Sequence, residues 1–321
     1  MARHAILSDV HANFEALQAV YRDIARDPHL HSIVSLGDLV GYGPNPAEAI
    51  AGLNSLTRKG YTVRYCMGNH DAAAVGRYEF VDLRDPADLE RLATEAGLKE
   101  LRDIGMHYKD PKKRKYIPVT ANAKLSIQWT APRLAEPYRQ FIIQNSKDHL
   151  ILTPGVLCVH ASPRDPLFHY VVTGRNAQKA LDAPLMAGIT TCFIGHTHVP
   201  GIWQLRAELL VRFAANVICM EPPRAIKTTK LQLHPESTIT IVNVGSVGQS
   251  RDGNPAAAYA VYDDTEQTVE LRRVPYDLEA TRRKILAAGL PPALAERLGA
   301  ANGERGVASE DPDADPQAPK P

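Results

Sequence analysis

The feature that most constrains the fold of this 321-residue chain is a recurrence of short apolar runs, each about as long as one β-strand. The runs are rich in Val, Ile and Thr, and several are apolar throughout, which is typical of strands buried on both faces. They span residues 4–9, 32–38, 62–69, 155–162, 190–198, 238–246, 257–263 and 268–276. This pattern predicts an α/β fold built from layers of sheet and helix.

Helical patterns lie between the early runs. Residues 13–25 place Phe14, Leu17 and Val20 at helical spacing, and Asn13 is a suitable N-cap. Residues 45–56 predict a second helix. Alternation of strand and helix at this spacing predicts βαβ units. The later runs follow one another closely, so we expect them to form a second, mainly antiparallel sheet.

Two ranges do not fit this pattern of strand-length apolar runs. Residues 77–150 are charged and mostly helical, and we interpret them as an inserted cap beside the site. Residues 203–236 predict an irregular excursion. The main domain then covers residues 1–276, followed by two short helices in 277–300 and a disordered tail at 301–321.

Composition excludes several classes of protein. The chain is 44% hydrophobic and 23% charged with a net charge of +1, so we expect a globular protein without a global preference for polyanions. No apolar stretch approaches the ~20 residues that span a membrane, and the N-terminus has no secretory signal, so we expect a cytoplasmic protein that does not bind membranes. Its four cysteines include no C-x-x-C pair, which disfavours a thiolate zinc cluster.

Polar residues gather where the predicted strands end. In open α/β sheets, ligands bind outside the carboxyl ends of the strands. The candidates, in chain order, are Asp9, His11, Asp38, Asn69, His70, Asp71, His160, His196 and His198. Five strands would therefore deliver carboxylate, amide and imidazole groups to one edge.

These residue types indicate what the edge would hold. Imidazole and carboxylate without thiolate suit Mn, Fe, Zn or similar divalent ions. A catalytic zinc takes only three protein ligands, so this set is too large for one such ion and divides between two. Two ions ~3.5–4 Å apart can stabilise both the attacking and the leaving oxygen during a displacement at phosphorus. Taken singly, each residue has a structural explanation, such as a turn at Asp38 or a helix cap at Asn69. Their ordered conjunction favours a site.

Five segments of the chain resemble the sequence blocks of the calcineurin-like metallophosphoesterases. They read SDVHAN, GDLVGYGP, GNHD, VHASP and GHTH. The spacing also agrees, since 25 residues separate His11 from Gly37 and 29 separate Asp38 from Gly68. The resemblance covers roughly residues 4–275. It implies a four-layer αββα sandwich with a helical cap insertion.

The resemblance also implies a role for each candidate. The first ion would be held by Asp9, His11, Asp38 and His198, and the second by Asp38, Asn69, His160 and His196, with Asp38 bridging. The cofactors would be two divalent ions, Mn²⁺ foremost, with Fe, Zn, Ni or Co as other candidates. A hydroxide shared by the ions would attack phosphorus. His70 would stabilise the transition state and protonate the leaving oxygen. Asp71 would orient His70 or the motif loop.

One departure from the family bears on the substrate. Eukaryotic-type protein phosphatases carry Asp-Arg after the second block, where this chain has Gly41-Tyr42-Gly43, so a Ser/Thr phosphatase is disfavoured. The segments GDLVGYGPNP and NVGSVGQSRDGNPAAAYAVYD instead resemble bacterial and archaeal single-domain predicted phosphodiesterases. Arg164 and Arg251 are candidates to replace the missing cation, and each has a solvated surface arginine as its alternative explanation.

The predicted activity is dinuclear metal-dependent hydrolysis of a small phosphodiester or nucleotide. A phosphomonoesterase or Ser/Thr phosphatase-like activity is the first alternative. The basic run at 110–115 leaves nuclease activity as a second alternative. A non-catalytic interaction scaffold is disfavoured, because His70 and all seven ligand positions are filled. The sequence leaves the oligomeric state open.

Overall fold

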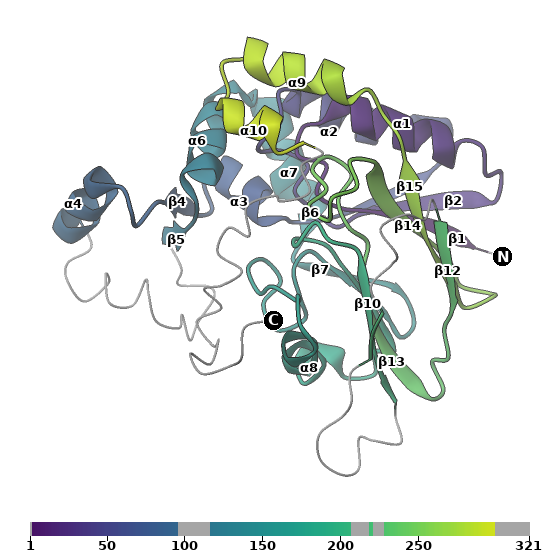
Figure 1. Cartoon of the computed structure of the whole chain (residues 1–321). Helices are drawn as coiled ribbons and strands as arrows, with labels where there is room; N and C mark the ends of the chain where they lie inside the picture. The colour runs from purple at the N-terminus through teal and green to yellow at the C-terminus, as the bar shows by residue number, and fades with distance from the viewer. Residues whose placement is uncertain (1, 96–115, 207–217, 221–227, 299–321) are drawn as a thin grey trace.

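The computed structural model describes residues 2–95, 116–206, 218–220 and 228–298. Two sheets lie face to face, and helices cover their outer faces (Figure 1). Among the described residues, the strand orders are β12-β15-β14-β1-β2-β3-β6 in the first sheet and β11-β10-β13-β9-β8-β7 in the second. The predicted α/β fold is confirmed.

The first sheet contains the βαβ units predicted from the early runs. Strands β1 (Arg3–Leu7), β2 (Leu30–Ser35), β3 (Thr62–Cys66) and β6 (Ser146–Lys147) are parallel to one another. Helices α1 (Phe14–Ile24) and α2 (Pro46–Ser55) connect the first three strands, and α3 (Asn69–Ala74) follows β3. Strands β14 (Ala257–Asp263), β15 (Thr268–Val274) and β12 (Thr228–Gln232) complete this sheet in antiparallel pairing.

The second sheet is mixed, with three antiparallel and two parallel pairings among its described strands. Strands β8 (Val156–Val159), β9 (Thr191–Ile194) and β13 (Thr238–Asn243) are parallel, and α8 (Gly174–Leu181) connects β8 to β9. Antiparallel edges are formed by β7 (His149–Thr153), β10 (Gly201–Arg206) and β11 (Ile218–Met220). The expected second, mainly antiparallel sheet is confirmed, but the expectation was wrong for β14 and β15, which pair within the first sheet. Apolar runs identify strands but do not say which sheet each one joins.

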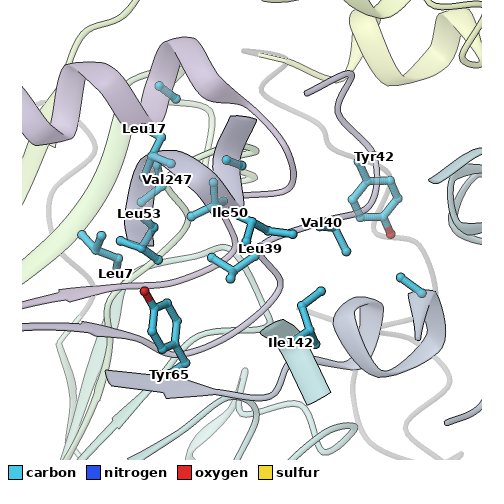
Figure 2. Close-up of a cluster of buried hydrophobic side chains, with 14 of the residues drawn as sticks. Leu7, Leu17, Leu39, Val40, Tyr42, Ile50, Leu53, Tyr65, Ile142 and Val247 are labelled. Atoms are coloured by element: carbon cyan, nitrogen blue, oxygen red, sulfur yellow. The ribbon is translucent and has the colours of Figure 1, made fainter. Parts of the chain in front are cut away.

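The core has one apolar layer on each side of each sheet. Successive side chains of a strand point to opposite faces. On β1, Ile6 therefore enters the layer between the sheets, whereas Leu7 joins the layer under the helices. On β9, Phe193 faces the other sheet and Ile194 packs toward α8. Figure 2 shows part of the helix-side layer, where Leu17, Ile50 and Leu53 lie near Leu7 and Leu39.

The two ranges that did not fit the pattern of strand-length runs contain helices and strands in the structure. Residues 77–150 include β4 (Glu79–Val81), α4 (Pro86–Glu95), β5 (Tyr116–Pro118), α6 (Ala121–Thr130) and α7 (Glu136–Asn145). The range ends in β6 of the first sheet and the start of β7, so its last residues belong to the two sheets. The described residues of 203–236 are largely in β10, β11 and β12. The basic run at 110–115 lies outside the described residues.

Short 3-10 turns occur at Thr57–Lys59, Ala131–Arg133 and Pro184–Met186.

Two short helices follow the last strand, as predicted. They are α9 (Leu278–Ala287) and α10 (Pro292–Glu296), and the predicted tail at 301–321 lies outside the described residues. Thr281 of α9 donates to Asn13 Oδ1 at 3.1 Å, and Trp129 of α6 donates to the Ala288 carbonyl at 2.9 Å. These bonds fix α9 beside α1 and α6 (Figure 1). None of the described helices is both long enough and apolar enough to cross a bilayer.

Candidate metal centre

All seven predicted ligands lie in one buried cluster at the carboxyl ends of parallel strands from both sheets. Each is at most 6% exposed. The cluster consists of Asp9 and His11 after β1, Asp38 after β2, Asn69 after β3, His160 after β8, and His196 and His198 after β9. Backbone hydrogen bonds join these strand ends, including Asp9 N–H to the Gly37 carbonyl at 3.1 Å and Gly195 N–H to the His160 carbonyl at 2.8 Å.

The backbone at the cluster is strained. A positive φ is uncommon outside glycine and costs ~1–3 kcal/mol per residue. It occurs at five of the seven candidates: Asp9 (53°), His11 (47°), Asp38 (53°), His196 (67°) and His198 (61°). Strain of this kind persists only where the surrounding structure fixes it, and it gathers at functional sites.

The first group of facing atoms comes from Asp9, His11 and His198. His198 Nε2 lies 3.1 Å from His11 Nε2 and 3.3 Å from Asp9 Oδ1. The second oxygen of Asp9 is already occupied, since Oδ2 accepts the His196 backbone N–H at 2.9 Å. Asp9 Oδ1 is buried and has no hydrogen-bond partner among the described residues.

The protonation of the two imidazoles suits a bound cation. His11 Nδ1 lies 3.1 Å from the Val40 carbonyl and His198 Nδ1 lies 2.6 Å from the Gln249 carbonyl, so each Nδ1 carries the proton. Burial lowers the pKa of both rings, with Arg251 adding to the effect at His198, whose pKa falls to about 4. Two lone pairs and a carboxylate oxygen therefore face one another. They repel one another unless a positive ion lies between them.

A second group faces the same space from the other side. His160 Nε2 lies 3.0 Å from Asn69 Oδ1 and 3.2 Å from His196 Nδ1. Asp38 Oδ2 lies 3.6 Å from His160 Nε2 and also 3.6 Å from His11 Nε2 of the first group. Asp38 Oδ1 accepts the His70 backbone N–H at 2.8 Å, which leaves Oδ2 directed at both groups. The geometry therefore fits two ions with one shared carboxylate.

His70 lies against the first group but belongs to neither. Its ring meets those of His11 and Phe80 edge-on, with centroids 5.0 and 5.2 Å away, and the Tyr42 centroid is 4.4 Å away. Nδ1 is buried and has no hydrogen-bond partner among the described residues. Burial holds the pKa of His70 well below its usual value, with a smaller contribution from His198. A neutral imidazole with an unpartnered Nδ1 among the described residues therefore lies beside the cluster.

Asp71 contacts backbone rather than His70. Its Oδ1 accepts the Val40 N–H at 3.1 Å and its Oδ2 accepts the Gly68 N–H at 3.3 Å. These two amides belong to the second and third motif loops, so the carboxylate ties those loops together. Of the two roles considered for Asp71, the contacts support orientation of the loops.

The structure brings the candidate Arg251 to the cluster. Arg251 N–H donates to the His198 carbonyl at 3.2 Å, and its guanidinium lies 5.9 Å from the Tyr42 ring centre. Its Nε is buried without a hydrogen-bond partner among the described residues. Arg164 is exposed on the loop after β8, and its N–H donates to Ser162 Oγ at 3.2 Å.

Two aromatic residues at the site were not identified from the sequence. The Tyr42 ring lies 4.7 Å from His11 as well as beside His70, and the Tyr170 ring lies 4.1 Å from His196. Tyr42 had a detectable signal, because two glycines flank it in the second block. Tyr170 had none, since its position depends on how the loop after β8 folds.

Gly41 provides a test of how tightly His70 is held. A Cβ at Gly41 would lie 2.5 Å from His70 Nδ1, and the φ of +88° adds strain. Gly41→Ala is expected to displace the His70 ring and lower turnover ~10–100-fold, while unfolding free energy falls by ~1–3 kcal/mol. Gly60→Ala is the matched control, because Gly60 has a φ of +93° with nothing within 4 Å. Denaturant unfolding and steady-state kinetics should show lost stability in both variants but lost turnover only in Gly41→Ala. Equal turnover in the two variants would contradict this picture of His70.

Comparison with known proteins identifies a family model and several proteins that this chain resembles. Residues 2–200 match the family model described as calcineurin-like phosphoesterase. The crystal structure of a metallophosphoesterase from Sphaerobacter thermophilus is 31% identical, covers 93% of this chain and 99% of that chain, and superposes with a TM-score of 0.66. An uncharacterized protein from Methanocaldococcus jannaschii is 28% identical over 92% of this chain and 96% of its own. A symmetrical bis(5'-nucleosyl)-tetraphosphatase from Serratia proteamaculans is 31% identical over 26% of this chain and 28% of its own.

Proposed function

Because the chain belongs to the calcineurin-like phosphoesterase family, as its motifs predicted, we propose that it is a dinuclear metal-dependent hydrolase of phosphodiester or nucleotide substrates. The observation that carries this proposal is the position of Asp38 Oδ2, which lies 3.6 Å from an imidazole nitrogen of each facing group. A single-ion site would not need a carboxylate oxygen shared between two sets of lone pairs.

The chain would hold the ions in two sets. Asp9, His11, Asp38 and His198 would hold the first, and Asp38, Asn69, His160 and His196 the second. Mixed nitrogen and oxygen ligands without thiolate favour Mn²⁺, with Fe, Zn, Ni or Co as alternatives. When bound, such a pair activates a water and neutralises charge on the phosphoryl oxygens. We place the reaction in the cytoplasm.

The remaining residues have separate tasks. His70 would donate a hydrogen bond to a phosphoryl or leaving oxygen, because its ring is fixed by Tyr42 and Phe80 and its Nδ1 has no partner among the described residues. Arg251 would contact a phosphate oxygen, since its Nε is likewise unpartnered there. Asp71 would act as a positioning residue through the backbone amides it binds.

The preference for diesters or nucleotides rests on two observations. Tyr42 occupies the place where the protein phosphatases carry an arginine, and with Tyr170 it provides aromatic surface beside the cluster. Aromatic rings stack on nucleobases. In addition, the partial relative from Serratia proteamaculans is named as a bis(5'-nucleosyl)-tetraphosphatase. A phosphomonoesterase activity is the main alternative.

Metal dependence and ester preference can be measured together. The Mn²⁺-loaded protein is expected to hydrolyse bis(4-nitrophenyl) phosphate, to lose this activity in a chelator and to regain it when Mn²⁺ is restored. Its kcat/KM should be at least ~10-fold higher than with 4-nitrophenyl phosphate, corresponding to ~1.4 kcal/mol of preferential transition-state binding. A higher value for the monoester would favour the alternative. Absence of hydrolysis of either ester at every metal tested would overturn the proposed function.

A further inference from the structure

We infer that Asn13, the residue before α1, is a positioning residue for the candidate metal ligand His198. Its side-chain amide holds the loop at 246–250 in the conformation in which the Gln249 carbonyl orients the His198 ring. The inference rests on the proposed function for the metal-binding role of His198. It couples the metal centre to this loop and to α9, which both lie beyond the residues 2–200 that match the family model.

The His198 ring depends on the Gln249 carbonyl for its role as a ligand. His198 Nδ1 donates to that carbonyl at 2.6 Å, which leaves the lone pair of Nε2 facing Asp9 and His11. Without this acceptor the proton is free to move to Nε2, and the ring then loses the lone pair that an ion requires. The backbone of His198 is also strained, with a φ of 61°, so neighbouring segments must keep it in place. The conformation of the loop at 246–250 therefore bears directly on the first group.

The peptide that precedes the Gln249 carbonyl is held on both sides. The Gly248 carbonyl accepts from Asn13 Nδ2 at 2.8 Å, and the Gln249 N–H donates to Ser246 Oγ, also at 2.8 Å. The Gly248 N–H donates to the Asp9 carbonyl at 2.9 Å. Asn13, Gly248 and Ser246 are buried. Loss of the Asn13 amide therefore leaves a buried carbonyl unpaired, and a rotation of this peptide relieves that cost at the expense of the His198 contact.

The orientation of the Asn13 amide is fixed by its other contacts. Its Oδ1 accepts the Ala16 N–H at 3.1 Å, which confirms Asn13 as the N-cap of α1, and Thr281 of α9 donates to the same oxygen. A backbone N–H can only donate, so the oxygen must face Ala16 and the NH₂ group must face the Gly248 carbonyl. One buried side chain thus connects α1, α9 and the loop at 246–250; the two helices lie together in Figure 1.

Asn13→Ser separates the contact with Gly248 from the helix cap. A serine still caps α1, but its shorter side chain has no amide to donate to the loop. In calorimetric titration with Mn²⁺, this variant is expected to bind one of the two ions ~10–100-fold more weakly than the wild type, as loss of a contact that orients a ligand predicts. The other ion should bind as in the wild type. Asn13→Asp, which keeps the size and the cap but replaces the donor with an acceptor, should weaken the same ion at least as much.

Thr120→Ala is the control for a general loss of stability. Thr120 caps α6 by accepting the Ala123 N–H at 3.4 Å, so its removal should lower the Tm and leave both Mn²⁺ dissociation constants unchanged. Anomalous diffraction at sub-saturating Mn²⁺ identifies the affected ion. In Asn13→Ser, the peak beside His198 should have a lower occupancy than in the wild type, and the peak beside His196 should not.

The outcomes that would overturn the inference are distinct from those that would overturn the proposed function. Unchanged dissociation constants in Asn13→Ser, or an equal weakening of both ions, would contradict a specific role for Asn13. The same loss of affinity in Thr120→Ala would also contradict it. If the wild type cleaves no phosphoester, the proposed function fails, and the Mn²⁺ affinities alone then decide whether Asn13 positions His198.

Discussion

Asp38→Asn is expected to lower phosphoester hydrolysis by at least ~1,000-fold and to reduce the bound metal from two ions per chain to one or fewer. Asparagine keeps the Oδ1 that accepts the His70 N–H at 2.8 Å, so the loop should retain its shape. What is lost is the charged oxygen shared by both groups. Because a bound ion supplies several kcal/mol of transition-state stabilisation, loss of the pair predicts a rate effect of this size. Metal analysis and steady-state kinetics on the same sample provide the test.

The same variant has an opposite effect on the metal-free protein. Asp38 is buried beside Asp9 and Asp71, and burial in the company of these carboxylates raises its pKa well above the usual value. In chelator, Asp38→Asn should therefore unfold at the same temperature as the wild type or higher. With Mn²⁺ the order should reverse, because only the wild type gains the full free energy of binding.

Asp71→Asn is the matched control, since Asp71 is equally buried but binds backbone amides. It should lose ~1–3 kcal/mol of stability and keep both ions. Retention of two ions by Asp38→Asn, or their loss from Asp71→Asn, would contradict the assignments of the two carboxylates.

His70→Ala is expected to keep both ions and to lose turnover by ~10²–10⁴-fold, the range typical of a positioned acid–base group. The backbone N–H that donates to Asp38 remains in this variant, so the metal centre should be unaffected. The measurement is kcat at saturating Mn²⁺, with metal content determined in parallel. His149→Ala is the control, because His149 is exposed on β7. Turnover equal to that of the wild type would remove His70 from the mechanism.

The sequence predicted the cluster well because its members lie at the ends of strands. Residues after parallel strands meet at one sheet edge whatever the loops between them do. The structure accordingly brings Asp9, Asp38 and Asn69 together from the first sheet with His160 and His196 from the second. Their role as metal ligands remains a prediction. The motif spacing also identified the family, which the family model confirms.

Features that depend on long-range packing could not be predicted in this way. The assignment of β14 to the first sheet depends on its pairing with β1, more than 200 residues earlier in the chain. Arg297 reaches Tyr42 only because α9 packs on α1 and α6, and a sequence pattern gives no sign of that contact. Arg164 and Arg251 were indistinguishable by residue type. The structure places Arg251 beside the cluster, because its backbone N–H donates to the His198 carbonyl.

Anomalous diffraction from crystals of the Mn²⁺-loaded protein tests the central claim most directly. Two peaks ~3.5–4 Å apart are expected. One should be coordinated by Asp9, His11 and His198, the other by Asn69, His160 and His196, and both by Asp38 Oδ2. A single peak at full loading, or a pair of peaks that does not share Asp38, would contradict the account.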